Sequence, residues 1–323
     1  MPRQTMRGHT GSVRCAVHLA DKRRIITSSN DGSVRLWDLK SGAQIGNSWH
    51  DHGQTGVRSI ALSPNGKTVA SGSQDGIMRL WDVKTETVIA RWVGHADYVR
   101  AVCWSADGER VVSGSNDGTV RICAVKSSET ILGPIKTGHE VVSAAIYSPD
   151  NTKIGTGGYN ENALKIWDAK TCELLITIKH DSMVWSLAWT SDQKKLISGD
   201  YDGWIRIFDT ATWQQIAILE GGHTDTVYAL ALFQNDRLLV SASGDKTACL
   251  WNLDTNLPVG PPLHHQAFVH SAAISGDGKL LVTGCSDGDV YVWDIHIILR
   301  DAGLEDLLSI SGVSANKHVP SQR

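Results

Sequence analysis

Apolar and polar residues alternate along short stretches of the chain, and such stretches return at a regular spacing. One of them is Val99 to Trp104, VRAVCW. Alternation with a period of two is typical of a strand that buries one face. A turn follows at Ala106-Asp-Gly108, and equivalent turns stand at Ser63-Pro-Asn-Gly66 and Ser148-Pro-Asp-Asn151. Because Gly, Pro, Asp and Asn favour turns, the pattern predicts short strands joined by tight connections.

The clearest unit of the pattern contains the stretch Ser71 to Asp82, SGSQDGIMRLWD. Val69 to Ser73 is predicted to be a strand, and Met78 to Trp81 is predicted to pair with it across an Asp-Gly hairpin. Asp-Gly favours a type I′ turn, in which both central residues have positive φ. A more variable segment, Glu86 to Val93, supplies a further strand. With the alternating run that precedes it, each unit has four predicted strands.

Seven copies of this unit occupy most of the chain. The aromatic or equivalent residue near the end of each copy stands at positions 37, 81, 123, 167, 208, 251 and 293, which are 41 to 44 residues apart. A histidine keeps the same spacing, at His9, His52, His95, His139, His180, His223 and His265. Repeats of this period form arrays that close into one domain, so the length of 323 residues does not require two.

A repeat of this length with Gly-His near its start and Trp-Asp near its end resembles the WD-repeat family. The resemblance covers residues 4 to 294. It implies an all-β fold, a seven-bladed β-propeller with four antiparallel strands in each blade. Gln4 to Arg7 stand where other copies have their fourth strand. They are therefore expected to complete the last blade and close the ring.

These expectations divide the chain into a propeller at residues 1–295 and a C-terminal tail at residues 296–323. Ile295 to Ile310 is moderately amphipathic, which is compatible with a short helix packed on the ring or with an alternative closing strand. The remaining residues of the tail have the composition of a disordered segment.

His, Ser or Thr, Asp and Trp recur at fixed offsets, and their donors and acceptors can satisfy one another inside a blade. The resemblance implies a structural network. A catalytic Ser-His-Asp set is disfavoured, because seven copies in register do not suit a single active site. Complete networks are expected in blades 1, 2, 6 and 7, and their members are His9, Thr27, Asp31, Trp37, His52, Ser71, Asp75, Trp81, His223, Ser241, Asp245, Trp251, His265, Thr283, Asp287 and Trp293.

Blades 3 to 5 are expected to be impaired. Cys123 and Phe208 stand at the tryptophan position of blades 3 and 5, and neither can donate like an indole. In blade 4 we expect Thr156 to be the hydroxyl member and Asn160 or Glu161 to be the acceptor.

Composition and motifs favour a binding protein over an enzyme. The formal net charge of −3 gives no overall basic field, so no direct nucleic-acid binding is expected. No Walker loop, HExxH, GxSxG or paired-cysteine motif is present, so we expect no catalytic site, cofactor or metal. Six scattered cysteines fit reduced thiols, and no apolar stretch is long enough for a membrane span. The expected location is the cytoplasm, and also the nucleus.

In the family that the chain resembles, partners bind the top face, around the central channel. The resemblance assigns to this face the residue after the leading valine of each first strand and the residue before each hairpin aspartate. From these we select as candidate partner-binding residues Arg14, Arg58, Arg100, Trp185, Tyr201, Tyr228 and His270. A half-basic, half-aromatic rim suits a peptide with acidic or phosphorylated residues and an apolar or cationic anchor. Alternatively, the arginines pair with carboxylates such as Asp97 and the aromatic residues are merely packed.

The preferred hypothesis is a non-catalytic, monomeric scaffold that binds a protein or peptide on this face and acts within larger complexes. A substrate receptor of a cullin-type ubiquitin ligase is an alternative, because Trp-Asp-x-Lys at Trp37–Lys40, Trp81–Lys84 and Trp167–Lys170 resembles the motif with which such receptors dock. A sensor or repeat module of a signalling protein is a further alternative. An enzyme is the least favoured.

Overall fold

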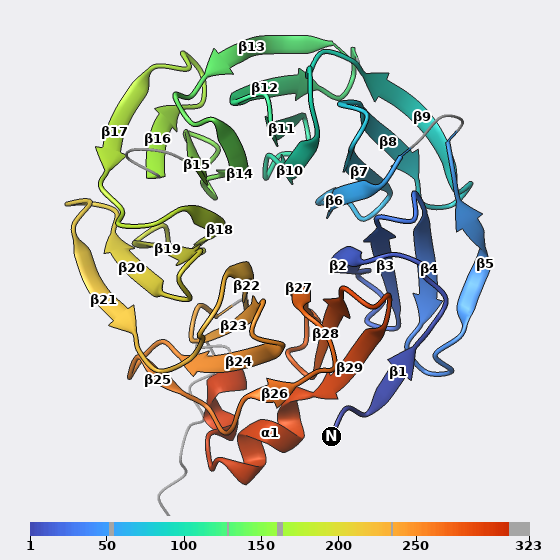
Figure 1. The fold of residues 1–323 in the computed structure, drawn as a ribbon, viewed down its shortest axis with the longest axis vertical. Coiled ribbons are helices and arrows are strands. Elements are labelled where there is room, and N and C mark those ends of the chain that lie inside the picture. Colours follow the sequence, from blue (N-terminus) through green and yellow to red (C-terminus); the bar gives the residue numbers. More distant parts are fainter. Residues whose placement is uncertain (52–54, 128, 160–163, 234, 310–323) are drawn as a thin grey trace, which may run out of the picture.

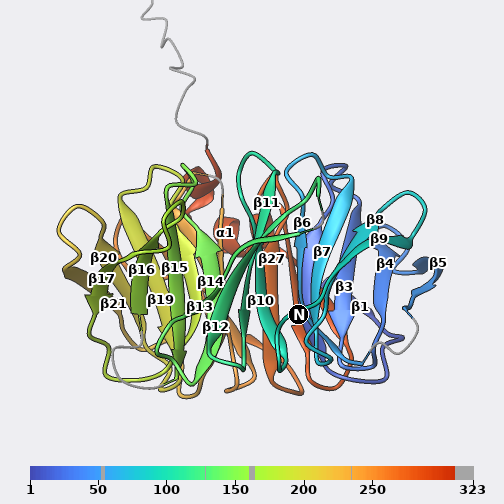
Figure 2. The same ribbon diagram turned by 90° about the horizontal axis from the view of Figure 1, so that it is seen from above.

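The structure is a computed structural model that describes residues 1–309 except 52–54, 128, 160–163 and 234. Seven antiparallel sheets surround a central axis, as Figure 1 shows from one face and Figure 2 from the side. This confirms the prediction of an all-β, seven-bladed propeller. The strand that lines the centre comes first in blades 1 to 6, and the chain then proceeds outward through each sheet.

Blades 1 to 3 are regular four-stranded sheets. Blade 1 contains β2 (Val13–His18), β3 (Arg24–Ser29), β4 (Val34–Asp38) and β5 (Gln44–Trp49). Blade 2 contains β6 (Val57–Leu62), β7 (Thr68–Ser73), β8 (Met78–Asp82) and β9 (Thr87–Trp92). Blade 3 contains β10 (Val99–Trp104), β11 (Arg110–Ser115), β12 (Thr119–Ala124) and β13 (Thr130–Lys136).

Blades 4 and 5 repeat this order, whereas the outer strand of blade 6 is split. Blade 4 contains β14 (Val141–Tyr147), β15 (Lys153–Tyr159), β16 (Leu164–Asp168) and β17 (Leu174–Ile178). Blade 5 contains β18 (Val184–Trp189), β19 (Lys195–Asp200), β20 (Ile205–Asp209) and β21 (Gln215–Leu219). Blade 6 contains β22 (Val227–Leu232), β23 (Leu238–Ser243), β24 (Thr247–Asn252), β25 (Leu257–Pro258) and β26 (Leu263–His264).

Blade 7 is completed by the N-terminus. Its strands are β27 (Val269–Ile274), β28 (Leu280–Cys285), β29 (Val290–Asp294) and β1 (Gln4–Met6). Thr5 pairs with Tyr291, and the Met6 side chain is only 1% exposed in a cluster that joins blades 7 and 1. The sequence therefore correctly predicted which strand closes the ring.

The tail begins as a helix. Asp294 caps α1 (Ile295–Asp301) by accepting a hydrogen bond from the Ile297 N–H. A short 3-10 helix, η1 (Glu305–Leu308), follows it. Ile295, Leu299 and Leu307 are buried against blades 6 and 7. Of the two forms expected for this segment, the structure has the helix; residues 310–323 lie outside the described part.

The hairpins between second and third strands differ from the predicted type I′ turn. In blade 1 the Gly32 N–H donates to the Ser29 carbonyl, and Gly32 alone takes positive φ, at 81°. Asp31 is absent from the positive-φ residues of the described chain. The turn is therefore a three-residue loop whose last residue is left-handed. This leaves the aspartate in ordinary backbone geometry, with its carboxylate directed to the blade.

Blades 1 and 6 contain the complete hydrogen-bond network. In blade 1 the Trp37 indole donates to Thr27 Oγ1 at 2.8 Å, and the His9 ring joins Thr27 Oγ1 and Asp31 Oδ2, each at 2.8 Å. In blade 6, Ser241 Oγ lies 2.9 Å from Trp251 Nε1 and 2.7 Å from the His223 ring, which also contacts Asp245.

In the described part of blade 2, the hairpin aspartate pairs with an arginine. The Trp81 indole donates to Ser71 Oγ at 2.9 Å, as expected. Asp75 forms an ion pair with the buried Arg79, which also contacts Asp51. His52 lies outside the described residues, so the expectation of a complete network stays a prediction here.

Blade 7 does not contain the complete network that the sequence suggested. His265 and Trp293 both contact Thr283 Oγ1, at 2.8 and 3.1 Å. Asp287, however, is exposed, and His265 Nδ1 has no hydrogen-bond partner among the described residues. The expected His265–Asp287 bond was wrong.

A hydroxyl two residues after the aspartate accounts for this difference. Ser33, Thr119 and Thr247 each donate to the aspartate and lie 3.1 to 3.2 Å from the histidine ring. Blade 7 has Asp289 at that position, and Asp289 forms an ion pair with Arg7. Two carboxylates this close repel each other, and no hydroxyl joins Asp287 to the ring.

In the impaired blades the hydroxyl member keeps its histidine. In blade 3, His95 contacts Ser113 and Asp117 at 2.9 Å each, although Cys123 supplies no indole donor. In blade 4 the Trp167 indole donates to Thr156 Oγ1 at 2.9 Å. Asn160 and Glu161, the expected acceptors, lie outside the described residues.

The closing strand generates a first prediction. Met6→Ala should lower the free energy of unfolding by about 2–5 kcal/mol, because it empties a site shared by two blades. Deleting residues 1–8 should lower it further. Chemical denaturation measures both, with Gln215→Ala on the exposed outer strand β21 as the control. Equal stability of wild type and the deletion would contradict closure by β1.

The buried histidines generate a second prediction. Burial lowers the pKa of His139 and His265 to about 4, so the folded protein keeps them neutral while the unfolded chain takes up protons below its ordinary pKa. The stability they contribute is present above about pH 6.5 and is lost as pH falls toward 4, at about 2 kcal/mol each by pH 5.

His265→Gln should therefore reduce the loss of stability between pH 7 and pH 5, as measured by urea denaturation at both values. The neighbouring His264 is exposed, so His264→Gln is the matched control and should keep the wild-type pH dependence. Identical slopes for all three proteins would refute the assignment.

Candidate functional site

Each inner strand contains one residue that has no partner on the second strand. The pairing shifts between Val13 and Cys15 in blade 1, and between Val57 and Ser59 in blade 2. The same shift occurs in every blade, and the residues passed over are Arg14, Arg58, Arg100, Ser143, Trp185, Tyr228 and His270. A β-bulge of this kind re-aims one side chain and is common next to functional sites.

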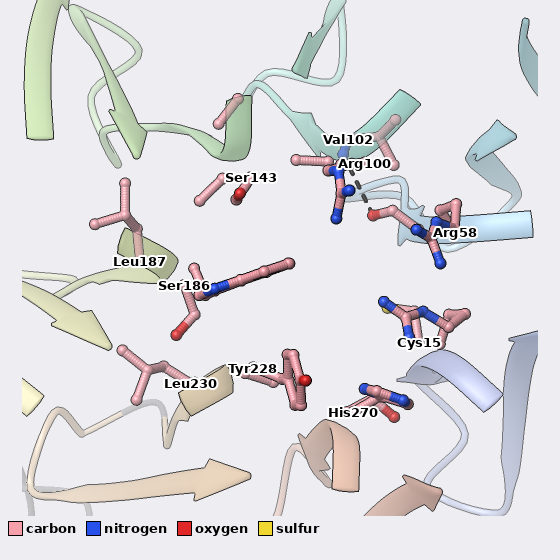
Figure 3. Close-up of a pocket in the computed structure, with 18 of the residues that line it drawn as sticks. Cys15, Arg58, Arg100, Val102, Ser143, Ser186, Leu187, Tyr228, Leu230 and His270 are labelled. Carbon is pink, nitrogen blue, oxygen red and sulfur yellow. Dashed lines mark hydrogen bonds between the residues drawn. The ribbon is translucent and has the colours of Figure 1, made fainter. Parts of the chain in front are cut away.

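The seven bulge residues line one cavity of about 280 Å³ at the centre of the ring. Figure 3 shows Arg58, Arg100, Tyr228 and His270 directed toward this space from different blades. Six of the seven candidate partner-binding residues are thus brought together. The seventh, Tyr201, does not line the cavity; it stands on the hairpin of blade 5 and is 53% exposed. We call the space between the bulge residues the channel.

The three arginines come from adjacent blades, and none forms an ion pair with a carboxylate of the described residues. The Arg58 guanidinium lies 5.5 Å from the centre of the Tyr98 ring, and that of Arg100 lies 5.3 Å from the Trp185 ring. Arg100 also donates to the side-chain oxygen of Asn116. The alternative of pairing with Asp97 is therefore not observed in this part of the chain.

Burial and mutual repulsion shift the titration of these groups. Burial, with repulsion from Arg58 and Arg100, lowers the pKa of Arg14 to about 9. Burial, with repulsion from Arg58, lowers the pKa of Arg100 to about 10. At neutral pH all three remain charged. Arg14 Nε and Arg58 Nε are buried without a hydrogen-bond partner among the described residues. Unsatisfied buried donors and unpaired charges are costly unless a ligand meets them.

The other side of the channel is aromatic. The Trp185 and Tyr228 rings meet edge to face with centres 5.5 Å apart. The centres of the Tyr228 and His270 rings are 4.6 Å apart. Burial, with the positive charges of Arg14 and Arg58, lowers the pKa of His270 to about 3, so its ring is neutral at pH 7. Trp185 Nε1 and His270 Nδ1 have no partner among the described residues. The channel thus offers charges, donors and ring faces to a ligand.

The sequence of the chain matches a known protein family. The family described as "WD domain, G-beta repeat" matches residues 1–38, 44–82, 86–123, 172–209, 213–252 and 260–294, which is more than half of the chain. The chain belongs to the WD-repeat family. The six matched repeats omit blade 4, the copy with the altered hairpin, and the structure supplies that blade as the seventh.

Curated relatives share part of the propeller with this chain. A WD repeat-containing protein WDS homolog of Arabidopsis thaliana is 31% identical over 159 residues, which is 48% of this chain and 30% of that protein. A serine-threonine kinase receptor-associated protein of Gallus gallus is 32% identical over 146 residues, 45% of this chain and 41% of its own length. Denticleless protein homolog B of Xenopus laevis is 31% identical over 127 residues, 38% of this chain and 18% of that protein.

The chain therefore spans less than half the length of each of these relatives, and their whole-protein activities do not transfer to it. WD-repeat propellers are general protein-interaction scaffolds and are typically non-catalytic. Among the described residues, no group of three or more His, Cys, Asp or Glu side chains is placed to hold a metal ion. No helix in the described part of the WD-repeat chain is long and apolar enough to cross a membrane.

Sequence reasoning missed two exposed residues of the top face. Tyr98 contacts Arg58 and is 36% exposed, and Trp204 on the blade 5 hairpin is 42% exposed. Trp204 stands two residues after the hairpin aspartate, where blades 1, 3 and 6 have a small hydroxyl residue. The sequence alone could have indicated Trp204 as an exposed residue, because tryptophan is too large for a position that is Ser or Thr in those blades.

The unpaired arginines generate a third prediction. Arg14→Met should leave the free energy of unfolding unchanged or raise it, because it removes a repelled, unsatisfied cation. Arg79→Met is the matched control: Arg79 is buried against Asp51 and Asp75, so its loss should cost about 3–5 kcal/mol. Urea denaturation compares the two variants. An equal loss in both would show that Arg14 has a structural role.

Proposed function

We propose that this chain is a non-catalytic scaffold that holds a segment of a protein partner on its top face, centred on the channel. The observation that carries the proposal is the group of three arginines without carboxylate partners in the described chain, two of which have unsatisfied buried Nε donors. A folded protein keeps such a group when a ligand completes it.

An anionic group of the partner best complements this side of the channel. Carboxylates and phosphoryl groups accept several hydrogen bonds from guanidinium groups and neutralise their charge. We therefore propose that the bound segment carries acidic or phosphorylated residues. The neutral ring of His270 and the aromatic pair Trp185 and Tyr228 then contact the less polar part of the segment.

The hypothesis of a ubiquitin-ligase receptor depends on the Trp-Asp-x-Lys motifs, and local geometry offers another explanation for them. The carboxylate of Asp38 accepts from the Lys40 N–H at 3.0 Å, and Asp82 and Asp168 accept equivalently from Lys84 and Lys170. Each motif is thus a turn in which Asp caps the backbone. Neither this alternative nor a signalling module has a specific observation in its favour.

The proposal is tested by affinity capture from a lysate, followed by mass spectrometry. The triple variant Arg14→Glu/Arg58→Glu/Arg100→Glu should lose at least tenfold of the principal partner captured by wild type. Lys40→Glu/Lys84→Glu/Lys170→Glu is the control. It makes the same change of charge at exposed turns and removes the lysines of the Trp-Asp-x-Lys motifs.

Loss of the partner in the arginine variant alone supports the top-face proposal. Equal capture by wild type and the arginine variant contradicts it. Loss in the lysine variant alone, together with a cullin complex among the wild-type partners, favours the ligase alternative. The melting temperature of each variant shows whether a loss reflects unfolding.

A further inference from the structure

The hairpin of blade 5 departs from those of blades 1, 3 and 6 at three neighbouring positions. The first is Asp200, which stands where blades 1, 3 and 6 have Ser29, Ser115 and Ser243. Those serines donate to a carbonyl of the preceding turn. Asp200 is instead fully buried, and it accepts a hydrogen bond from Arg206 and lies 3.8 Å from the His180 ring. The carboxylate beside the histidine of blade 5 therefore comes from the end of β19.

This substitution frees the usual hairpin carboxylate. In blades 1, 3 and 6 that aspartate contacts the histidine ring at 2.8 to 2.9 Å. In blade 5 the equivalent residue, Asp202, is exposed and forms no ion pair within the described chain. Its negative charge is therefore presented to solvent on the top face.

Trp204 is the third departure, and it is displaced for a steric reason. Blades 1, 3 and 6 have Ser33, Thr119 and Thr247 at this position, where a small hydroxyl reaches both the aspartate and the histidine. An indole is too large for that space and cannot accept a hydrogen bond. The Trp204 side chain therefore lies outside, two residues from Asp202, with Tyr201 on the other side of the turn.

A second exposed carboxylate belongs to Asp225, in the turn between the hairpins of blades 5 and 6. This turn leads into β22. A Cβ placed on Gly203 of the blade 5 hairpin would lie 3.2 Å from the Asp225 carbonyl, and one placed on Gly244 of the blade 6 hairpin would lie 2.9 Å from the Asp225 carboxylate oxygen Oδ2. Thr226 Oγ1 donates to the Tyr201 carbonyl at 3.2 Å, which joins the two loops. Asp225 forms no ion pair among the described residues. It lies three positions before Tyr228, which lines the channel. We call Tyr201, Asp202, Trp204 and Asp225 the aromatic rim.

The chemistry of the aromatic rim is opposite to that of the arginines. The aromatic rim combines two exposed aromatic side chains with two exposed carboxylates that form no ion pair in the described chain, on loops that contact each other. Such a surface attracts a cation through the ring quadrupole and through charge. An apolar side chain would use the rings but would leave the carboxylates less hydrated and unpaired. The rim therefore selects a lysine or arginine side chain over an aliphatic one.

We infer that the aromatic rim binds a cationic side chain, so that a segment seated on the top face is oriented by an anionic group at the arginines and a cation at blade 5. The inference rests on the proposed function in one respect, namely that the ligand is a segment of a protein partner. The preference of the rim for cations is a property of this chain and is testable alone.

The test uses small probes and the indole signals of the isotope-labelled full chain in NMR spectra, with the Trp204 signal assigned from Trp204→Phe. N-acetyl-arginine N-methylamide is the cationic probe and N-acetyl-norleucine N-methylamide the apolar one. We expect the arginine probe to shift the Trp204 signal. Asp202→Asn/Asp225→Asn should weaken its binding about threefold to tenfold. Asp287→Asn, at the exposed hairpin carboxylate of blade 7, is the matched control and should bind as wild type does.

Equal shifts with the norleucine probe, or an unchanged affinity in the double variant, would overturn the inference. The dispersion of the other indole signals reports whether the variants are folded. The result is separable from the capture experiment. If the arginine variant retains every partner while the arginine probe still shifts Trp204, the proposed function fails and the cation site stands.

Discussion

One shared hydroxyl determines the geometry of most blades. In blades 1, 4, 6 and 7 a single Ser or Thr oxygen accepts from the tryptophan indole and contacts the histidine ring. The three side chains are buried, so removing one of them leaves a hydrogen-bonding atom of another unsatisfied, which lowers the free energy of unfolding. The histidine belongs to the turn that leads into the inner strand, and the hydroxyl belongs to the second strand. Their bond therefore fixes the two strands between which each bulge forms.

The network positions and the bulge positions lie close together in the described repeats but carry different chemistry. In blades 1 and 6 the buried network members satisfy one another, while the bulge residues line the channel and the hairpin residues Tyr201, Asp202 and Asp287 are exposed. Where a blade alters its network, a top-face residue is released. In blade 5, Asp200 takes the internal position and Asp202 faces outward; in blade 7, Asp289 leaves Asp287 exposed. Departures from the repeat thus generate the individual surface of this propeller.

Most of the architecture could be predicted from the sequence, because the repeat specifies it seven times. The period gave the blades, and the position of Gln4 to Arg7 before the first Gly-His gave the closure. The type I′ hairpin was wrong, since a third loop residue carries the positive φ alone. The His265–Asp287 bond was wrong because it also needs the hydroxyl that Asp289 replaces. The bulges were not visible in the sequence, because an unpaired residue depends on the register between two strands. The exposed carboxylate of blade 5 could not be predicted, because the sequence does not show that Asp200 is buried and Asp202 is exposed.

The central claim is that partners bind the top face while the blade networks serve only as support. Hydrogen exchange of the propeller, alone and in complex with its captured partner, tests this most directly. The account predicts slower exchange at the inner-strand bulges that contain Arg14, Arg58 and Arg100 and at the blade 5 hairpin, with the outer strands unchanged. Slowing confined to the outer strands, or to the turns that contain Lys40, Lys84 and Lys170, would contradict it.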